Sequence, residues 1–181
     1  LGTGFVVQKV SKMRTILPGG STTDMAAPGF MIDRDRFDQT LAGEARKLGA
    51  KFLLSTNAME LTEEGHAVIR ERTGKTATIA PRVIIGADGP RSKTALWCGA
   101  PDRNLLPAAQ FKMALCGPMN HTEVHLSPHI YGGYGWLFPK GGAANVGLGM
   151  KRDHSHPGRI YNLLSEFTEQ LKKEGKIKGD P

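Results

Sequence analysis

Cysteine and long apolar runs are scarce in this sequence, and both shortages narrow the class of protein. The two cysteines, Cys98 and Cys116, are too few for a disulfide framework and indicate a reducing, cytoplasmic setting. No stretch approaches the roughly 20 apolar residues that a membrane-spanning helix needs, and no basic-then-apolar leader opens the chain. The basic residues are scattered, with no run of five, so we expect no nucleic acid partner.

Glycine and positive charge, by contrast, are abundant. The 181 residues include 23 glycines, about twice the ordinary share, which indicates many tight turns or backbone that approaches a ligand closely. The formal net charge of +7 favours solubility or an anionic partner such as a phosphate or a lipid headgroup. The chain begins Leu-Gly-Thr, without Met, and becomes strand-like within a few residues. We therefore expect it to be a segment of a longer protein.

Hydrophobic periodicity predicts a mixed α/β chain. Apolar residues recur every three to four positions over 35–48 and over 157–174, which predicts two helices. In the first, Phe37, Leu41 and Leu48 lie on one face. Most of the remainder is expected to be strand. The predicted strands are 4–10, 13–17, 30–32, 51–58, 59–62, 67–72, 76–79, 82–86, 109–115, 123–126, 135–138 and 144–150.

The segment 82–86 is a continuous β-branched run with no polar face, which is typical of a strand buried on both sides in a parallel sheet. It ends at Asp88-Gly89, and a short helix is predicted to start near Arg91 or Ser92. Ligands collect at the carboxyl ends of such strands, and the N–H groups of a helix start can bind phosphate. Asp-Gly is equally common in plain tight turns, so both interpretations stay open.

Four of the chain's twelve aromatic residues lie within 131–138. Tyr134, Trp136 and Phe138 alternate along the sequence, so on a strand all three face the same side. Glycines flank the row, which would make it a wide apolar wall. Such a wall is typical of ordinary core packing and equally of a pocket for a flat or apolar ligand.

Other chemistry has weaker support in the sequence. His121, His125 and His129 are spaced by four, but the region has the pattern of strand and turn, so the spacing does not gather them and no metal site is predicted. No complete dinucleotide fingerprint, phosphate-binding loop or Gly-x-Ser-x-Gly motif occurs. Nothing therefore indicates a hydrolase or a kinase.

Taken together, several of these motifs resemble a flavoprotein family. Arg-Asp-Arg-Phe-Asp at 34–38 and Gly-Ala-Asp-Gly-Pro at 86–90 resemble the p-hydroxybenzoate hydroxylase-like superfamily. Tyr-x-Trp-x-Phe-Pro at 134–139 and Ala-Asn-Val-Gly-Leu-Gly at 144–149 are similar to its geranylgeranyl reductase branch. The matches cover nearly the whole chain in the expected order. The chain is thus identified as an internal part of a member of the geranylgeranyl reductase family of FAD-dependent oxidoreductases.

The resemblance implies part of an FAD-binding Rossmann-like domain interleaved with an antiparallel-sheet substrate domain. On that template residues 32–100 belong to the FAD-binding domain, whereas 1–31 and 101–181 belong to the substrate domain. The family's dinucleotide fingerprint would precede this chain, and a second flavin-contacting Gly-Asp motif would follow it. The chain would then hold roughly half of a flavin site.

The resemblance also implies particular site residues. Arg34 matches an arginine that reaches toward the polar chain of the flavin, and Ala87, Asp88 and Gly89 match a turn that approaches FAD. The residues that match the lining of the isoprenoid cavity are Tyr134, Trp136, Phe138 and Pro139. No catalytic residue and no metal ligand is assigned.

The implied activity is FAD-dependent reduction of geranylgeranyl double bonds in a lipid or pigment precursor. Two alternatives stay open: a flavin-dependent aromatic hydroxylase or halogenase, and a non-catalytic lipid-binding fragment. The electron donor is NAD(P)H or a redox protein such as reduced ferredoxin, because Ser92 is followed by Lys93 and not by the family's usual nearby arginine. We expect a cytoplasmic protein with peripheral membrane association, and we expect the isolated segment to be inactive.

Overall fold

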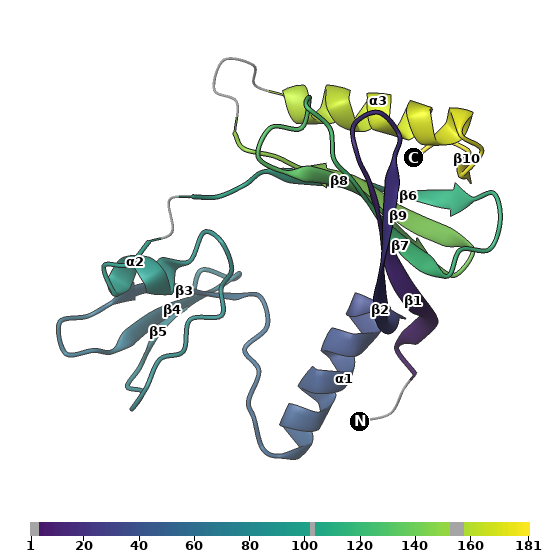
Figure 1. Ribbon diagram of the computed structural model, residues 1–181. Helices are drawn as coiled ribbons and strands as arrows, with labels where there is room; N and C mark the ends of the chain where they lie inside the picture. The colour runs from purple at the N-terminus through teal and green to yellow at the C-terminus, as the bar shows by residue number, and fades with distance from the viewer. Residues whose placement is uncertain (1–3, 102–103, 153–157) are drawn as a thin grey trace. The chain divides into compact units, whose positions relative to one another are not determined.

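A computed structural model describes residues 4–101, 104–152 and 158–181 (Figure 1). The predicted helix start at 157 lies outside the described residues. The chain divides into two compact units, Leu1–Gly43 with Leu106–Pro181, and Glu44–Leu105. These limits differ from the 32–100 division expected from the resemblance, so the assignment of the FAD-binding and substrate domains stays a prediction.

The first unit is built on a seven-stranded sheet in the order β10-β6-β9-β8-β7-β1-β2. Neighbouring strands are antiparallel except β1 and β7, which are parallel. This confirms the expected fold class, a mixed α/β chain with a largely antiparallel main sheet. The strands are β1 (Val6–Ile16), β2 (Thr22–Ile32), β6 (Ala108–Leu115), β7 (His121–His125), β8 (Tyr134–Lys140), β9 (Ala143–Gly149) and β10 (Ile177–Lys178).

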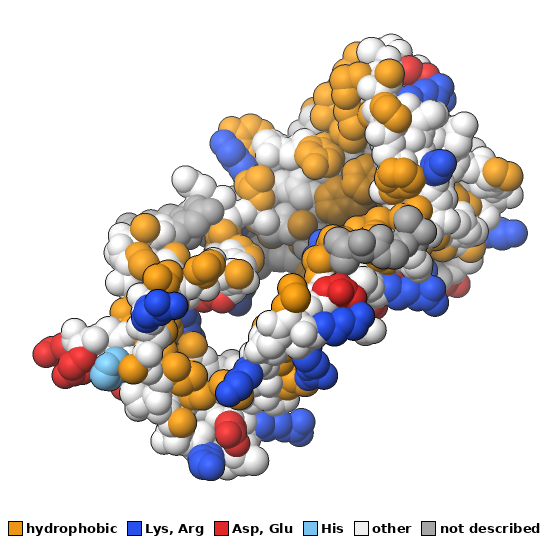
Figure 2. Space-filling view, turned by 90° about the horizontal axis from the view of Figure 1, so that it is seen from below, with side chains coloured by type: hydrophobic (Ala, Val, Ile, Leu, Met, Phe, Trp, Pro, Cys, Tyr) orange, Lys and Arg blue, Asp and Glu red, His pale blue; other side chains and the backbone are white. Residues whose placement is uncertain are grey.

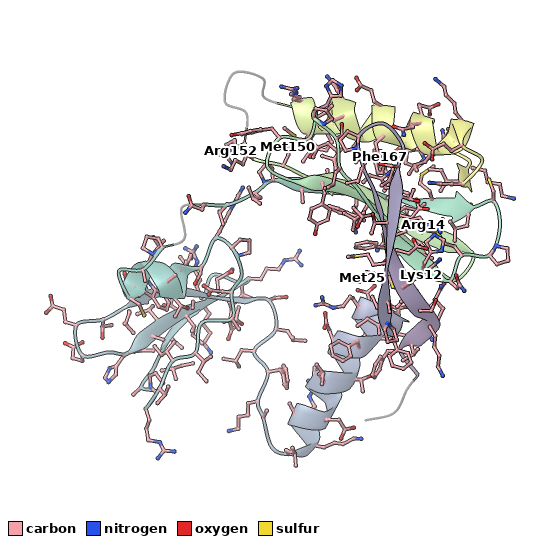
Figure 3. The ribbon with its side chains drawn as sticks, viewed as in Figure 1. Lys12, Arg14, Met25, Met150, Arg152 and Phe167 are labelled. Carbon is pink, nitrogen blue, oxygen red and sulfur yellow. The ribbon has the colours of Figure 1, made fainter. Side chains whose placement is uncertain are left out.

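Helix α3 (Arg159–Lys173) covers one face of this sheet and forms its core (Figures 1 and 3). Its apolar stripe buries Leu164, Phe167 and Leu171, as the periodicity predicted. The sheet contributes side chains that are almost fully buried, among them Leu137 and Val146. Because strand residues alternate between faces, one face of β6, β8 and β9 belongs to this core and the other does not.

Two long strands at one edge of the sheet were only partly predicted. The segments expected at 4–10 and 13–17 form one strand, β1, which is irregular in its register near Val7 and Ser11. β2 extends well before the predicted 30–32 and begins at Thr22. Its first half lacks an alternating pattern, so its strand conformation depends on pairing with β1. Pro28 is tolerated because β2 is an edge strand.

The second unit carries a three-stranded antiparallel meander, β3 (Thr56–Leu61), β4 (Ala67–Glu71) and β5 (Thr76–Ile79), with the short helix α2 (Lys93–Trp97). The meander and its turns are as expected. Gly65 and Gly74 close the two turns with positive φ values of 80° and 88°, which glycine adopts without strain. The strand predicted over 51–58 is wrong, because the chain becomes extended only from Thr56.

The strand predicted over 82–86 is also absent from the described structure. Val83 and Ile85 are 76% and 85% exposed, and no described strand pairs with them. A β-branched run of this kind needs neighbouring strands to satisfy its backbone groups, and the described part of the chain supplies none.

Helix α1 (Arg34–Lys47) agrees with its predicted range to within one residue at each end. Gly49, with a φ of 94°, follows its C-terminus as expected. The apolar stripe exists, but none of the residues of α1 is buried and Leu48 just beyond it is 90% exposed. Within the described residues, no helix is long and apolar enough to cross a membrane.

A buried ion cluster ties β7 to the segment that leads into β10. Glu123 is only 3% exposed. Its carboxylate lies 2.9 Å from the Nε2 atom of His125 and accepts a hydrogen bond of 2.8 Å from the Nζ atom of Lys176. His121 contacts the same carboxylate at 3.4 Å. Two of the histidines noted in the sequence thus lie on one strand face beside a common carboxylate.

The ionised form of Glu123 is the stable one in this setting. Burial by itself raises the pKa of Glu123, but the hydrogen bonds from His125 and Lys176 and the charge of Lys176 outweigh it and lower the pKa to about 2. A carboxylate with a depressed native pKa stabilises the fold at pH values above its ordinary pKa. That stabilisation is lost as the pH falls through the native value.

We predict that Glu123→Gln lowers the free energy of unfolding at pH 7 by about 2 kcal/mol, because it removes the buried partner of Lys176 and leaves only the more exposed Glu174 at 3.0 Å. Urea unfolding of the complete protein at pH 7 and at pH 3 measures this. The difference between the variant and wild type should shrink toward pH 3, as the native carboxylate approaches protonation. An equal difference at both pH values would contradict the assignment.

Candidate functional site

The aromatic side chains of β8 form a continuous row on the sheet face that α3 does not cover. The ring centroids of Tyr134 and Trp136 are 6.0 Å apart, and those of Trp136 and Phe138 are 6.1 Å apart with an interplanar angle of 27°. Tyr134 is 45% exposed and the other two are half-buried. Since the core lies on the opposite face, the row is not part of the buried core of the described residues.

Two glycines of β9 allow the row to lie flat. In the antiparallel register, Gly147 is opposite Trp136 and Gly149 is opposite Tyr134. A Cβ atom on Gly147 would lie 2.4 Å from Cζ2 of Trp136 and 2.7 Å from the carbonyl oxygen of Ala109. The indole therefore lies directly over the backbone of β9. Sequence analysis noted these glycines only as part of the motif at 144–149 and did not predict this contact.

The register adds apolar residues from distant parts of the sequence to the same face. Val124 of β7 is opposite Trp136. Thr15 of β1 pairs with Val124 and so shares its face. Residues two apart on a strand lie on the same face, so Met13 is also there. Its partner on β2, Met25, lies on that face too. Figure 2, seen from below, shows hydrophobic side chains gathered over this unit. The strand pattern alone could not indicate these neighbours, since they depend on the pairing of β1, β2 and β7.

Pro139 lies on the other face of the sheet. It is almost fully buried on the side of α3, next to Leu137 in the alternation. Its ring therefore does not extend the aromatic row, although it belongs to the same sequence motif. Its assignment to the lining of a substrate site remains a prediction, and its side chain does not lie on the face of the aromatic row.

The Asp-Gly turn has a defined geometry in the second unit. The carboxylate of Asp88 accepts hydrogen bonds from the Ser92 hydroxyl at 2.5 Å and from the backbone N–H groups of Lys93 at 2.7 Å and Thr94 at 3.2 Å. The Ser92 hydroxyl in turn accepts from the N–H of Ala95 at 2.9 Å. The bond from Ser92, with help from the backbone N–H groups, lowers the pKa of Asp88 to about 2.

This arrangement bears on the two interpretations that the sequence left open. The first N–H groups of α2 could have been available for phosphate, but Asp88 and Ser92 already accept them. The backbone of the turn at 87–89 is exposed and accessible to a ligand, and Gly89 there has a φ of 77°. Gly86 packs so closely on Thr94 that a Cβ would lie 2.7 Å from the Cβ of that residue, so the turn and α2 form one local structure.

Arg34 lies in the first turn of α1, where its guanidinium is 71% exposed and 3.2 Å from the carboxylate of Asp38. It belongs to the first compact unit, whereas Asp88 belongs to the second. In chemistry both fit FAD. An exposed guanidinium suits its phosphates, and an open glycine turn lets backbone approach its polar chain.

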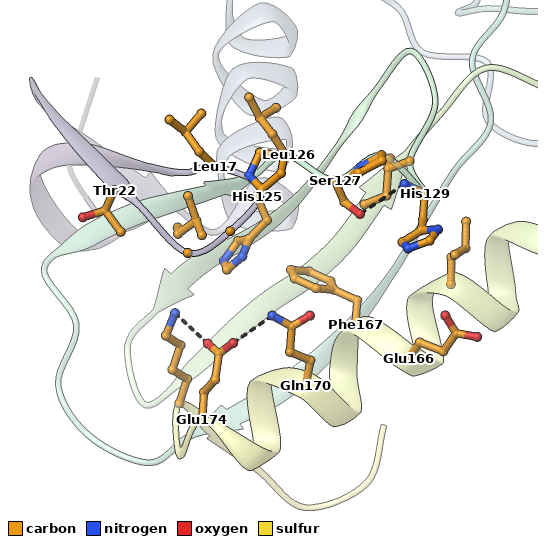
Figure 4. A pocket seen from close by; sticks show the side chains of 18 residues that line it. Leu17, Thr22, His125, Leu126, Ser127, His129, Glu166, Phe167, Gln170 and Glu174 are labelled. Atoms are coloured by element: carbon orange, nitrogen blue, oxygen red, sulfur yellow. Dashed lines mark hydrogen bonds and ion pairs between the residues drawn. The ribbon is translucent and has the colours of Figure 1, made fainter.

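A separate pocket of about 600 Å³ lies on the α3 side of the first unit (Figure 4). It is bounded by the β1–β2 turn at Leu17, by the segment after β7, and by α3. His125 lies inside it, with its ring 4.9 Å from that of Phe167. No sequence motif marked this pocket, and it lies on the opposite face from the aromatic row.

Comparison with known proteins agrees with these features. A family model described as an FAD binding domain matches residues 22–109, and one described as a geranylgeranyl reductase catalytic domain matches residues 108–179. The aromatic row lies in the second match and the Asp-Gly turn in the first. The two matches together cover most of the chain.

Curated relatives carry the name digeranylgeranylglycerophospholipid reductase. The protein from Methanothrix thermoacetophila is 35% identical over 96% of this chain and 48% of its own length. That from Methanosarcina acetivorans is 33% identical over 98% of this chain and 48% of its own length. The chain therefore spans about half the length of the curated relatives it matches.

Solved structures show the same fold. A geranylgeranyl bacteriochlorophyll reductase-like protein from Thermoplasma acidophilum has a TM-score of 0.86 at 25% identity, covering 99% of this chain and 50% of that one. The flavin-dependent brominase Bmp2 has a TM-score of 0.66 at 13% identity, covering 97% of this chain and 50% of its own, which shows the fold alone. The class that the fold and the family match define is that of FAD-binding proteins. Within it, the chain belongs to the geranylgeranyl reductase family.

We predict that Gly147→Ala lowers the free energy of unfolding of the complete protein by about 1–3 kcal/mol, because the added methyl group overlaps Trp136 and the Ala109 carbonyl. The matched control is Gly142→Ala, where a Cβ meets nothing within 4 Å. Urea unfolding followed by tryptophan fluorescence measures both. Equal stability of the two variants would contradict the close contact between β9 and the indole.

We predict that Asp88→Ala speeds amide hydrogen exchange at Lys93 and Thr94, because their N–H groups lose an acceptor. Glu63→Ala, an exposed carboxylate in another turn of the same unit, serves as control and should leave them unchanged. Since the pKa of Asp88 is about 2, wild-type protection should persist at pH 4 and be lost only as the pH falls further. Unchanged exchange in Asp88→Ala would show that the cap contributes nothing.

Proposed function

We propose that the complete protein is an FAD-dependent reductase that saturates carbon–carbon double bonds in the geranylgeranyl chains of a lipid. The observation that carries this proposal is the flat, partly exposed aromatic row of β8, which lies within the region that matches a geranylgeranyl reductase catalytic domain. The names of the curated relatives support a prenylated glycerophospholipid as the substrate class.

The chemistry of the row suits a prenyl chain. Three adjoining rings and the neighbouring Val124 offer an apolar surface, and no charged side chain interrupts the row itself. Burying a hydrocarbon chain there gains roughly 25 cal/mol per Å² of apolar surface removed from water. Trisubstituted double bonds carry no polar handle, so contact with a shaped apolar wall is the means by which the protein can orient them.

Reduced FAD, when bound, would supply the hydride for such a reduction. The residues available to hold it are the guanidinium of Arg34 and the backbone of the turn at 87–89. The chain's own contribution is to orient the prenyl chain and exclude water. The predicted electron donor is NAD(P)H or a reduced ferredoxin. Association with a membrane surface is likewise a prediction.

The first test is the visible absorption spectrum of the purified complete protein, before and after dithionite. A flavin spectrum that bleaches on reduction, followed by saturation of a geranylgeranyl lipid detected by mass spectrometry, is the expected result. A protein that takes up no FAD would overturn the proposal and favour the lipid-binding alternative. A flavin that forms a productive oxygen adduct on a substrate would favour the hydroxylase alternative.

We predict that Trp136→Ala lowers kcat/KM for a geranylgeranyl lipid by about 10-fold or more, because it removes the central ring of the apolar wall, while the flavin content stays unchanged. Tyr161→Ala removes a 63% exposed ring from α3 and should change neither quantity. Steady-state reduction with flavin absorbance of the same samples measures both. Loss of flavin from Trp136→Ala would contradict the assignment of the row to substrate.

A further inference from the structure

The aromatic row ends in a positively charged region. Lys140 follows Phe138 in the alternation of β8 and so shares its face. On the neighbouring strand, Asn145 is the register partner of Phe138. One strand further, Lys112 of β6 is the partner of Asn145. Two lysines and an amide therefore border the Phe138 end of the row on the same face of the sheet.

Among the residues that the structure describes, these three side chains have no partner. No ion pair or hydrogen bond joins the side chain of Lys112, Lys140 or Asn145 to any other described residue. Lys112 is exposed, whereas Lys140 and Asn145 are half-buried. Their donors are thus free to bind a ligand at the surface of the sheet.

No carboxylate opposes this charge on the same face. The seven strands contain two acidic residues, Asp24 and Glu123. Glu123 is opposite Leu137 and so faces α3. Asp24 pairs with Arg14, which in turn pairs with Glu123, so it lies on that same side. Among the residues of the seven described strands, those on the face with the aromatic row therefore include lysines and no carboxylate, which favours an anion there.

Strand spacing allows the two lysines to share one ligand. β6 and β8 are separated only by β9, and Lys112 and Lys140 are offset by two residues along β9. Their backbones therefore lie roughly 12 Å apart, within reach of two long flexible side chains. The residue of β9 opposite Lys140 is Ala143, a small side chain. A phosphate above Ala143 and Asn145 could accept from both ammonium groups and from the amide.

We propose that Lys112, Lys140 and Asn145 bind a phosphate group of the prenyl substrate while the aromatic row binds its hydrocarbon chain. This inference rests on the proposed function and deepens it, because it makes the substrate an anionic amphiphile and fixes its direction along β8. The head lies at the Phe138 end, and the chain extends toward Tyr134. The same phosphate chemistry occurs in the diphosphate of FAD, so the test separates the two sources.

The test compares two probes on the complete flavin-loaded protein, geranylgeranyl diphosphate and uncharged geranylgeraniol. Binding is measured by calorimetry and turnover by product analysis, for wild type, Lys112→Gln, Lys140→Gln and the double variant. Lys173→Gln, an exposed lysine on α3 with the same change in charge, is the matched control. Lys112→Arg keeps the charge and should keep most of the affinity.

The expected result is at least a 10-fold weaker binding of the diphosphate in the double variant, with less than a twofold change for geranylgeraniol and for the Lys173→Gln control. Equal weakening for both probes, or no weakening, would overturn the proposal. Loss of flavin from the double variant would overturn it too, because the lysines would then hold the cofactor. Charge-dependent binding without any reduction would leave this inference standing and refute the proposed function.

Discussion

The antiparallel pairing of β8 with β9 is the constraint on which the rest of the first unit depends. It places Leu137 and Val146 on the face that α3 covers, and it places Trp136 over Gly147 on the other. A shift of one residue would bury the aromatic row and expose the core. The contact between the indole and Gly147 opposes such a shift, because every other residue at that position would collide with the ring.

The two faces are stabilised by different means. The α3 face combines apolar packing with the buried cluster around Glu123, whose bond to Lys176 joins the sheet to the segment after α3. The aromatic face is the one that α3 does not cover, and its three rings are only half-buried or exposed. The helix therefore supplies the stability of the sheet from one side, which leaves the other side free to present residues to a ligand.

How much the sequence could predict depended on the range of the interactions. Features that depend on local periodicity were predicted correctly. They are helix α3 and the alternation of Tyr134, Trp136 and Phe138. The segment 82–86 was not predicted correctly, because a buried strand requires neighbours that its own pattern cannot supply. The sequence left open whether the N–H groups of α2 bind phosphate, because it did not show that Asp88 would turn back onto them. The role of Lys112 was invisible, since only the register of β6 with β9 brings it beside Phe138.

The separate roles of the apolar row and the lysines also explain why no catalytic residue could be assigned from the sequence. A reaction whose electrons come from a cofactor requires the protein to hold an apolar chain in place and to admit it in one direction. An apolar row does the first at any point along its length, because its contacts are much the same for each isoprene unit. It cannot do the second, since dispersion contacts do not distinguish the two ends of a chain. A charge at one end does, and on this face Lys112 and Asn145 lie level with Phe138, while Lys140 lies beyond it. Position along the row would then decide which double bond is presented for reduction.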